Sequence, residues 1–311
     1  MLHITILSPC FNEESNVEEF FQRVSTQFKT LNEYSFDVLF IDNCSTDNTV
    51  QIITKLIESN SNIRLIVNSR NFGHIRSPYY GLLQTDADAT ILLASDLQDP
   101  PELIPLLLNK WRHGFPIVKA VKNKSHETAS MYLIRTAYYK LLAKLTNLVL
   151  TEHYTGSGLY DRSIISIFKK INDPYPYFRG LVSDIGFDFA IVEFTQPKRV
   201  RGLTKNNFYT LYDMAMLGIT NHSKVPLRIA TFLGFLMSIG SISIGLVYFV
   251  LKIIYWERFQ AGVLPIMLGI FFFGSVQLLF LGIIGEYIGN IHTQVQNRPL
   301  VLEKKRVNFA T

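Results

Sequence analysis

The chain has 311 residues and a formal net charge of +5, and 48% of its residues are apolar whereas only 18% are charged. An ordinary soluble chain has roughly 25% charged residues, so this composition excludes a disordered chain, a collagen-like repeat and a nucleic-acid-binding tail. The two cysteines, Cys10 and Cys44, form no disulfide framework and have no metal-binding spacing, which indicates a reducing compartment. The excess of positive charge suits an anionic substrate or an anionic membrane surface.

The first 120 residues predict short strands that alternate with helices. Apolar runs predict strands, and helical spacing of apolar residues predicts the segments between them. The predicted strands are 3–8, 36–41, 63–68 and 90–94, and the predicted helices are 16–31, 49–59 and 75–85. This alternation indicates an α/β fold with a mainly parallel, Rossmann-like sheet, in which ligands bind beyond the carboxyl ends of the strands.

The C-terminal third of the chain contains two long apolar runs, 227–251 and 262–284. Each exceeds the roughly 20 residues that cross ~30 Å of hydrocarbon, which favours a transmembrane helical hairpin over two helices buried in a soluble core. We expect a connector of about ten residues on the far side, containing Lys252. Basic residues flank the hairpin on the side of the large domain, which the positive-inside tendency makes cytoplasmic. These residues are Lys224, Arg228, Arg298, Lys304, Lys305 and Arg306. The N terminus shows no signal peptide.

Three of the predicted strands are followed by loops that carry acidic or amide side chains: 9–14, 42–43 and 96–99. Carboxylates gathered at one sheet edge repel one another unless a cation lies between them. A divalent metal that bridges to nucleotide phosphates would satisfy this arrangement. The chain has no phosphate-binding loop of the Gly-x-x-x-x-Gly-Lys type and no Gly-x-Gly-x-x-Gly motif, which disfavours P-loop and dinucleotide enzymes. For Asp47, capping of the following helix is the preferred interpretation.

Several of these segments resemble one family. The runs Ser-Pro-Cys-Phe-Asn-Glu-Glu at 8–14 and Ile-Asp-Asn-Cys-Ser-Thr-Asp-Asn-Thr at 41–49 resemble family 2 glycosyltransferases of GT-A fold. Ser-Arg-Asn-Phe-Gly-His at 69–74 and Asp-Leu-Gln-Asp-Pro-Pro-Glu at 96–102 narrow the resemblance to the polyprenyl-phosphate glycosyltransferases. That group includes dolichol-phosphate mannose synthase, the GtrB proteins and ArnC. The segments 199–205 and 281–289 resemble further elements of the group, so the similarity spans nearly the whole chain.

The resemblance implies roles for individual residues. Donor-nucleotide binding is implied for Pro9, Asn12, Glu13, Asp42, Asn43 and Lys122. Asp96 and Gln98 match the ligands of Mg²⁺ or Mn²⁺, which would neutralise charge on the leaving nucleoside diphosphate. Binding of the donor and acceptor phosphates is implied for Arg135, Arg199 and Lys205, since cations suit phosphate esters. Asp96, Lys205 and Asp161 are the candidate catalytic residues. For each lysine, a solvated surface charge is the alternative interpretation.

The sequence also departs from the family pattern. Asn43 and Ala94 stand where the family has acids, and Gly156 and Gly158 replace an acid and an arginine. A catalytic base is nevertheless dispensable, because a phosphate monoester with a second pKa of ~6 is already largely a dianion near neutral pH. Asp161 is the nearest acid in sequence, and its alternative role is to cap a helix over 163–169. Asp184 is a second candidate for a relocated base.

From these patterns we predict four parts: a GT-A domain over 1–205, a juxtamembrane amphipathic helix over 206–225, two transmembrane helices within 226–290 and a cytosolic tail over 291–311. A second amphipathic helix is expected over 131–150. Both amphipathic segments suit the membrane interface, and ordinary core packing is the alternative for each.

The expected function is transfer of a sugar from a UDP-hexose or UDP-N-acetylhexosamine to polyprenyl phosphate at the cytoplasmic face of a bacterial inner membrane. The product would be a lipid-linked monosaccharide for modification of envelope glycans. We expect metal dependence and inversion by a single displacement, because no side chain stands out as a covalent nucleophile. A processive polysaccharide synthase and an inactive membrane scaffold remain the alternatives. No nucleic-acid partner is expected, and a homo-oligomer is possible.

Overall fold

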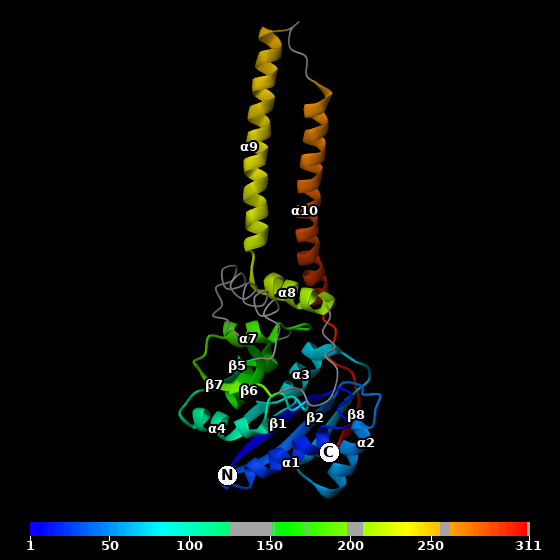
Figure 1. Cartoon of the computed structure of the whole chain (residues 1–311), viewed down its shortest axis with the longest axis vertical. Helices are drawn as coiled ribbons and strands as arrows, with labels where there is room; N and C mark the ends of the chain where they lie inside the picture. The colour runs from blue at the N-terminus through cyan, green and yellow to red at the C-terminus, as the bar shows by residue number, and fades with distance from the viewer. Residues whose placement is uncertain (125–150, 152, 172, 198–207, 256–261, 310–311) are drawn as a thin grey trace.

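The computed structural model describes residues 1–124, 151, 153–171, 173–197, 208–255 and 262–309. Within these ranges the chain forms one eight-stranded sheet with helices on both faces and a long helical hairpin that projects from it (Figure 1). The elements in chain order are β1 (Leu2–Cys10), α1 (Val17–Phe28), β2 (Tyr34–Asp42), α2 (Thr49–Ser59), β3 (Ile63–Asn68), α3 (Gly73–Leu83), β4 (Ala89–Leu92), η1 (Pro101–Leu103), α4 (Ile104–Arg112), β5 (Ile117–Lys124), β6 (Tyr154–Asp161), α6 (Arg162–Lys170), α7 (Phe178–Asp184), β7 (Phe189–Thr195), α8 (Phe208–His222), α9 (Val225–Ile254), α10 (Val263–Gln296) and β8 (Glu303–Val307).

The strand order is β7-β5-β6-β4-β1-β2-β3-β8. The four strands that the sequence predicts, β4, β1, β2 and β3, are mutually parallel, whereas β6 runs antiparallel to both β4 and β5. The predicted mainly parallel, Rossmann-like sheet is therefore confirmed. The helix α2 and the strand β3 have the predicted bounds, and the other predicted elements of this region shift by a few residues at their ends.

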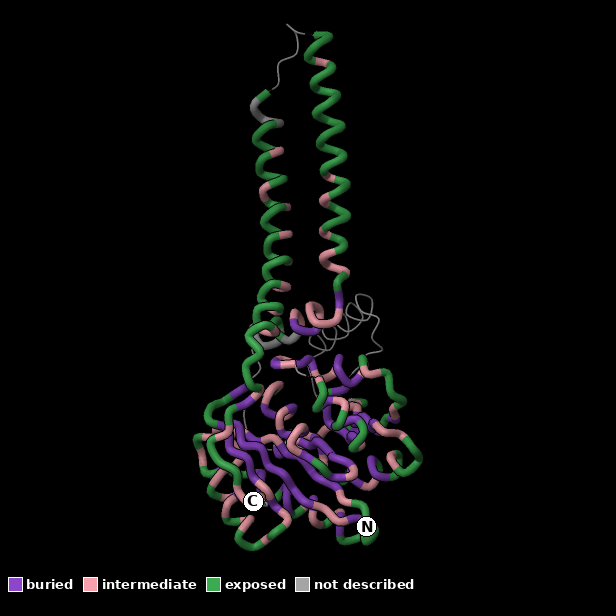
Figure 2. Tube along the Cα trace, turned by 180° about the vertical axis from the view of Figure 1, so that it is seen from behind, coloured by how far each residue is buried: buried purple, intermediate pink, exposed green. Residues whose placement is uncertain are grey.

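The core lies on both faces of the sheet because successive side chains of a strand point to opposite faces. On one face, Ile4 and Ile6 of β1 are fully buried in a cluster with α1, α2 and α4. On the other face, Leu7 of β1 and Leu39 of β2 are buried in a cluster with α3, α6 and α7. Figure 2 shows the strands as the buried centre of the domain. Burial on both faces explains why the strands have nearly continuous apolar sequences.

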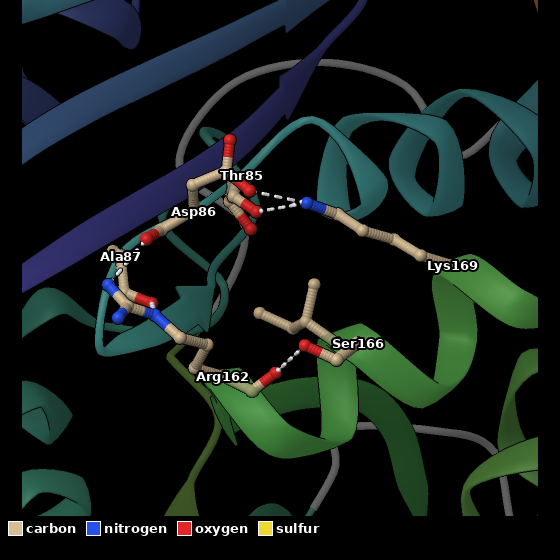
Figure 3. A pocket seen from close by; sticks show the side chains of 7 residues that line it. Thr85, Asp86, Ala87, Arg162, Ser166 and Lys169 are labelled. Carbon is tan, nitrogen blue, oxygen red and sulfur yellow. Dashed lines mark hydrogen bonds and ion pairs between the residues drawn. The ribbon is translucent and has the colours of Figure 1, made fainter.

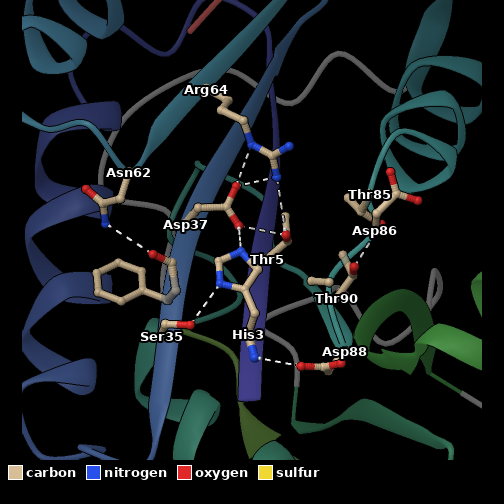
Figure 4. Close-up of polar contacts among 12 residues, drawn as sticks. His3, Thr5, Ser35, Asp37, Asn62, Arg64, Thr85, Asp86, Asp88 and Thr90 are labelled. Carbon is tan, nitrogen blue, oxygen red and sulfur yellow. Dashed lines mark hydrogen bonds and ion pairs between the residues drawn. The ribbon is translucent and has the colours of Figure 1, made fainter. Parts of the chain in front are cut away.

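A polar network closes the amino-terminal edge of the sheet (Figure 4). The Asp37 carboxylate accepts hydrogen bonds from the Thr5 hydroxyl (2.7 Å) and from Arg64 Nε (2.5 Å), and His3 Nε2 lies 2.9 Å from it. Asp37 is nearly buried, so these partners offset the cost of removing its charge from water. The network joins the first halves of β1, β2 and β3, so it fixes the end of the sheet that is remote from the ligand-binding edge.

Among the described side chains of α9 and α10, none in the apolar stretch of either helix is buried, and both helices are long and apolar enough to cross a membrane. The predicted span 227–251 lies inside α9, and the predicted span 262–284 lies inside α10 except for its first residue, Gly262, which is the N-cap. Two details differ from the prediction: Lys252 belongs to the last turn of α9 rather than to the connector, and α10 continues to Gln296. At the base of the hairpin, the Tyr287 hydroxyl donates to Ser223 O (2.7 Å), and Gln294 Nε2 donates to Asp173 Oδ1 (2.8 Å).

The segment predicted as a cytosolic tail contains a strand of the main sheet. After α10 the chain returns to the large domain, where β8 pairs antiparallel with β3 (Leu65 opposite Val307). Arg306, which the sequence assigned to the membrane flank, forms an ion pair with Glu303 instead. The predicted boundary at residue 291 therefore requires correction, because one strand of the large domain's sheet lies C-terminal to the hairpin.

Candidate active site

The three predicted loops meet at the carboxyl edge of the sheet. Cys10 and Asp42 are opposite each other in the β1–β2 register, which places the loops after these strands side by side. The loop after β4 joins them through the Ser95 hydroxyl, which donates to Pro9 O (3.1 Å). The structure thus brings together the segments that contain Pro9, Asp42 and Asp96, as the parallel sheet predicts.

Asp42 is fully buried at the end of β2. Burial raises the pKa of its carboxyl group, and hydrogen bonds from Ser45 act in the opposite direction. The Ser45 backbone N–H donates to Asp42 Oδ2 (3.0 Å), and its hydroxyl donates to Oδ1 (2.5 Å). The neighbouring thiol of Cys10 is buried, and burial together with the Asp42 charge raises its pKa well above the usual value. Cys10 is therefore a neutral packing residue at neutral pH.

Asn12 and Glu13 hold the first two loops together. Asn12 has a φ of 57°, and its side-chain Oδ1 accepts a hydrogen bond from the Thr46 backbone N–H (2.8 Å). The Glu13 backbone N–H donates to the Thr49 hydroxyl (2.9 Å), and its carboxylate accepts a hydrogen bond from Asn16. These contacts give both residues a structural role in shaping the site. Asp47, predicted to cap the following helix, accepts a hydrogen bond from the Thr49 backbone N–H (3.0 Å) at the start of α2, but the N-cap position itself is Asn48.

Asn43 links the end of β2 to the loop between β3 and α3. Its amide nitrogen donates to Asn71 Oδ1 (2.9 Å) and to Gly73 O (3.1 Å). Its amide oxygen accepts from Asn68 Nδ2 (3.1 Å) and from the Phe72 backbone N–H (2.9 Å). An acid at this position could not make the two donor contacts, so the departure from the family pattern has a structural explanation here.

Asp96 and Gln98 lie on a sharp turn after β4, in which Leu97 has a φ of 60°. The Gln98 backbone N–H donates to Asp96 Oδ1 (3.1 Å), and both side chains are partly exposed. In the part of the chain that the structure describes, no three His, Cys, Asp or Glu side chains gather into a metal-binding group. Asp96 and Gln98 thus offer oxygen ligands of the type that Mg²⁺ prefers, but they leave most of its coordination to phosphates and water.

Asp99, which the sequence analysis placed in this loop without a role, is buried behind the turn. Its carboxylate accepts a hydrogen bond from the Ser157 hydroxyl, and Lys122 Nζ lies 3.9 Å from its Oδ1. Burial raises the pKa of Asp99, and the Lys122 charge opposes this shift. The one feature of the sequence that could have indicated a role for Asp99 is its position directly after the predicted metal ligand Gln98.

Lys119 is a buried cation that the sequence analysis missed. Its side chain is fully buried, its Nζ donates to the Thr151 hydroxyl (3.1 Å), and it lies 3.6 Å from the centroid of the Phe189 ring. Burial lowers the pKa of Lys119 to about 8. Lysine is rarely buried without an acidic partner, and cation–π contact compensates part of the cost here.

Asp161 lies at the opposite edge of the sheet, because it pairs with Ala89 at the beginning of β4. Its carboxylate accepts from the Ser163 backbone N–H (2.8 Å) at the start of α6 and from Trp111 Nε1 (2.8 Å). The predicted helix cap is confirmed. This placement corrects the catalytic assignment of Asp161, because the strand β4 separates it from Asp96. Asp184 is exposed at the end of α7.

The backbone conformation explains why Gly156 and Gly158 stand where the family pattern has an acid and an arginine. Gly156 has a φ of 107°, and a Cβ there would lie 3.2 Å from the Phe178 ring. Gly158 has a φ of 149°, and a Cβ there would overlap the carbonyl oxygen of Val118 in β5. Side chains other than glycine strain the backbone at such positive φ angles, so neither position can carry the family's acid or arginine in this conformation.

Three predicted phosphate-binding residues, Arg135, Arg199 and Lys205, lie outside the described residues, as does the predicted amphipathic segment 131–150. The second such segment is the helix α8, which lies across the base of the hairpin (Figure 1). Its Leu217 is buried against Tyr177, whereas Tyr212 is exposed and its hydroxyl donates to Glu286 of α10 (3.1 Å). The role of α8 at a membrane interface stays a prediction.

A pocket of about 310 Å³ lies on the other side of the domain, between α6 and the segment before β4 (Figure 3). Its two cations are already paired: Lys169 Nζ donates to Thr85 O (2.9 Å) and to Asp86 (2.6 Å), and Arg162 donates to Asp86 O (2.7 Å). The pocket is remote from the carboxyl edge, so it is not part of the candidate active site.

Comparison with known proteins agrees with this architecture. The model of the glycosyl transferase family 2 matches residues 5–168, which include the loops of the candidate site. An uncharacterized glycosyltransferase of Synechocystis is 32% identical over 97% of this chain and 94% of its own length. A prophage-derived bactoprenol glucosyl transferase of Shigella flexneri is 32% identical over 98% of both chains.

Among solved structures, mannosyl-3-phosphoglycerate synthase from Rubrobacter xylanophilus is similar with a TM-score of 0.50. Its sequence identity is 14%, and 75% of each chain is covered, so this similarity concerns the fold alone. It agrees with a GT-A sheet and helices for the large domain. The family model spans the loops after β1 and β2 and the Asp96 turn, and the relatives extend through the hairpin. The chain belongs to glycosyl transferase family 2.

Proposed function

We propose that this enzyme transfers a sugar from a nucleotide-sugar to a polyprenyl phosphate at a membrane surface. The observation that carries the proposal is that one chain combines the loop cluster at the carboxyl sheet edge with a hairpin long and apolar enough to span a membrane. The strand after the hairpin, β8, belongs to the same sheet as these loops. The Shigella relative, a bactoprenol glucosyl transferase that matches along the whole chain, supports a polyprenyl acceptor. A UDP-hexose or UDP-N-acetylhexosamine is the proposed donor.

The proposed donor site consists of the buried Asp42 with Pro9, Asn12 and Glu13 for the nucleoside and of Lys122 for the diphosphate. Buried Asp42 can accept hydrogen bonds from a base or ribose, since its position is fixed by Ser45. Arg135, Arg199 and Lys205 are the proposed contacts of the donor and acceptor phosphates, because charge-assisted hydrogen bonds to phosphate are strong.

A divalent ion fits the Asp96 turn as far as ligand chemistry is concerned. Asp96 and Gln98 supply oxygen atoms from side chains that are partly exposed, and the donor diphosphate would complete the coordination of Mg²⁺ or Mn²⁺. When bound, such an ion neutralises the charge that develops on the leaving nucleoside diphosphate. The role of this chain's own residues is to hold the diphosphate in place between Asp96 and Lys122.

The acceptor needs no enzyme base in this proposal. A phosphate monoester has a second pKa of about 6, so its oxygen attacks the sugar C1 as a preformed dianion while the bond from C1 to the nucleoside diphosphate breaks. One displacement inverts the anomeric centre. The rate should therefore rise with pH through a single ionisation near ~6, the ionisation of the lipid phosphate. The glycine at 156 then carries no catalytic penalty.

The proposed orientation places the GT-A domain in the cytoplasm of a bacterium. Both hairpin ends point toward this domain (Figure 1), and the exposed Lys224 and Arg228 lie at the start of α9. Basic residues at the ends of transmembrane helices favour the cytoplasmic side.

The proposal is tested with membranes that contain the enzyme, radiolabelled UDP-sugars and polyprenyl phosphate, followed by extraction into organic solvent. A lipid-linked monosaccharide supports it. A long polymer would indicate a processive synthase, and the absence of product with every donor would indicate a scaffold protein. Membranes with Asp96→Asn are the matched control, because this variant removes one charge from the turn and leaves the hairpin unchanged.

A further inference from the structure

The pair of Asp99 and Lys122 is not explained by the packing of the domain. Asp99 is 5% exposed, and its Oδ2 accepts a hydrogen bond from the Ser157 hydroxyl. The other oxygen, Oδ1, is buried and accepts no hydrogen bond from any described residue. Lys122 Nζ, at 3.9 Å, is close enough for charge attraction but too far for a hydrogen bond to this oxygen.

This arrangement is costly for stability alone. A carboxylate loses favourable hydration when it is buried, and a cation at 3.9 Å that makes no hydrogen bond to it compensates this loss only in part. A well-packed apolar side chain at position 99 would avoid the cost. The ammonium of Lys122, with a side chain that is 14% exposed, is drawn to the carboxylate at the edge of the sheet where the loops meet. A lysine side chain otherwise samples many rotamers, and the attraction to Asp99 restricts them.

We propose that Asp99 is a positioning residue that holds the Lys122 ammonium beside the Asp96 turn, ready to bind the diphosphate of the nucleotide donor. Three connections support this role. Asp99 follows the Asp96 turn directly, Lys122 lies near the end of β5, which pairs with β6, and Ser157 of β6 fixes the second carboxylate oxygen. The inference rests on the proposed function as far as the diphosphate donor is concerned, and not on the identity of the acceptor.

The contrasting explanation is that Asp99 only ties the β4 loop to β6 through Ser157. The two explanations make different predictions for the partners of Asp99. A positioning role requires Lys122, so an Asp99 substitution should lose its effect on nucleotide binding when the ammonium is absent. A purely structural link requires Ser157, so removal of its hydroxyl should then reduce nucleotide affinity as much as removal of the Asp99 carboxylate.

The test is a double-mutant cycle on the full-length protein with UDP affinity as its readout. We expect Asp99→Asn to weaken UDP binding about 10-fold in the wild-type background and by less than about 2-fold in the Lys122→Met background. Ser157→Ala should change UDP affinity by less than about 3-fold, since it leaves the charge of Asp99 in place. An equal effect of Asp99→Asn in both backgrounds, or an effect of Ser157→Ala as large as that of Asp99→Asn, would overturn the inference.

Thermal stability gives a second readout that does not require nucleotide binding. Lys122→Met alone should lower the melting temperature because it leaves Asp99 buried without its cation, and addition of Asp99→Asn should restore most of the loss. Failure of this rescue would contradict the pairing itself. If the wild type binds GDP or CDP in place of UDP, the cycle uses that nucleotide. Absence of binding to all three would contradict the proposed function, whereas binding without coupling would contradict only the role of Asp99.

Discussion

The hydroxyl of Tyr80 in α3 donates a 2.7 Å hydrogen bond to the carboxylate of Glu303 in β8, across a sequence separation of 223 residues. Between these two residues the chain completes the GT-A domain and passes through the whole hairpin. Glu303 also accepts from Arg306 Nε (2.5 Å), and Arg306 reaches Gln84 (2.6 Å). Beyond the strand, Asn308 donates to Ile63 O (2.7 Å). The end of the chain is thereby attached to the catalytic domain along the outer edge of the sheet.

The first prediction concerns this attachment. Deletion of residues 299–311 from the full-length protein should lower the melting temperature by several degrees, because β3 loses the pairing with β8 and becomes an unprotected sheet edge. The deleted protein should also aggregate more readily. Melting curves and size-exclusion profiles in detergent test this, with Lys304→Ala, an exposed change within β8, as the control that should behave as wild type. An unchanged melting temperature in the deleted protein would show that β8 contributes no stability.

The second prediction concerns Asp96. Asp96→Asn should lower kcat/KM by at least ~10²-fold, the scale expected when a key electrostatic contact in the transition state is lost. EDTA should stop turnover of the wild type, and Mg²⁺ or Mn²⁺ should restore it. The matched control is Asp86→Asn, which changes an exposed aspartate at the pocket remote from the site. Activity of Asp96→Asn within about three-fold of wild type would refute the assignment.

The third prediction concerns Asn43, where the family pattern has an acid. Asn43→Asp should destabilise the protein by roughly 1–3 kcal/mol, because a buried carboxylate would face Gly73 O and Asn71 Oδ1 without the two N–H donors of the amide. Denaturation of the detergent-purified protein measures the loss. Asn71→Asp is the control, since Asn71 is exposed and can be hydrated. A variant as stable as wild type, with higher activity, would mean that the amide has no structural role.

The fourth prediction concerns Asp161. Asp161→Asn should cost about 1 kcal/mol of stability, the usual worth of a helix cap, and should leave kcat within ~10-fold of wild type. Trp111→Phe, which removes the other hydrogen bond to the same carboxylate, should also reduce stability without a specific loss of kcat. Both quantities are measured on the same preparations. Abolished transfer in a folded Asp161→Asn protein that still binds donor would restore this residue as the base.

The fifth prediction concerns pH and Lys119. The pKa of this buried lysine is lowered to about 8, below that of an exposed lysine, so above pH 8 the folded protein holds fewer protons than the unfolded chain. The free energy of unfolding therefore gains a contribution that grows as pH rises from about 8 toward about 10.5. Lys119→Met should lack this rise and should be more stable than wild type at pH 7, with a difference that shrinks as pH increases. A pH-independent difference would contradict the shifted pKa.

Local patterns in the sequence determine the strands, the helices and the membrane hairpin. Runs such as 63–68 and 49–59 are marked by spacing and by turn residues at their ends, so their structure follows from nearby residues alone. The carboxyl-edge position of Asp42 and Asp96 also follows from the sequence, because parallel strands place their ends together. Family resemblance carries the residue roles onto these positions, and the helix-capping role of Asp161 follows from its place just before a helix.

Contacts between distant segments are decided by the tertiary structure. The sequence gives no sign that 303–307 adds to β3, that Asn43 fastens the β3–α3 loop, or that Asp99 turns inward toward Lys122. Each of these depends on which residue lies opposite in space, and a hydrogen-bonding or charged side chain gains a defined role only from that partner. The physical reason is that burial and pairing, which set the cost of a polar group and the direction of its pKa shift, are properties of the assembled sheet rather than of neighbouring residues in the chain.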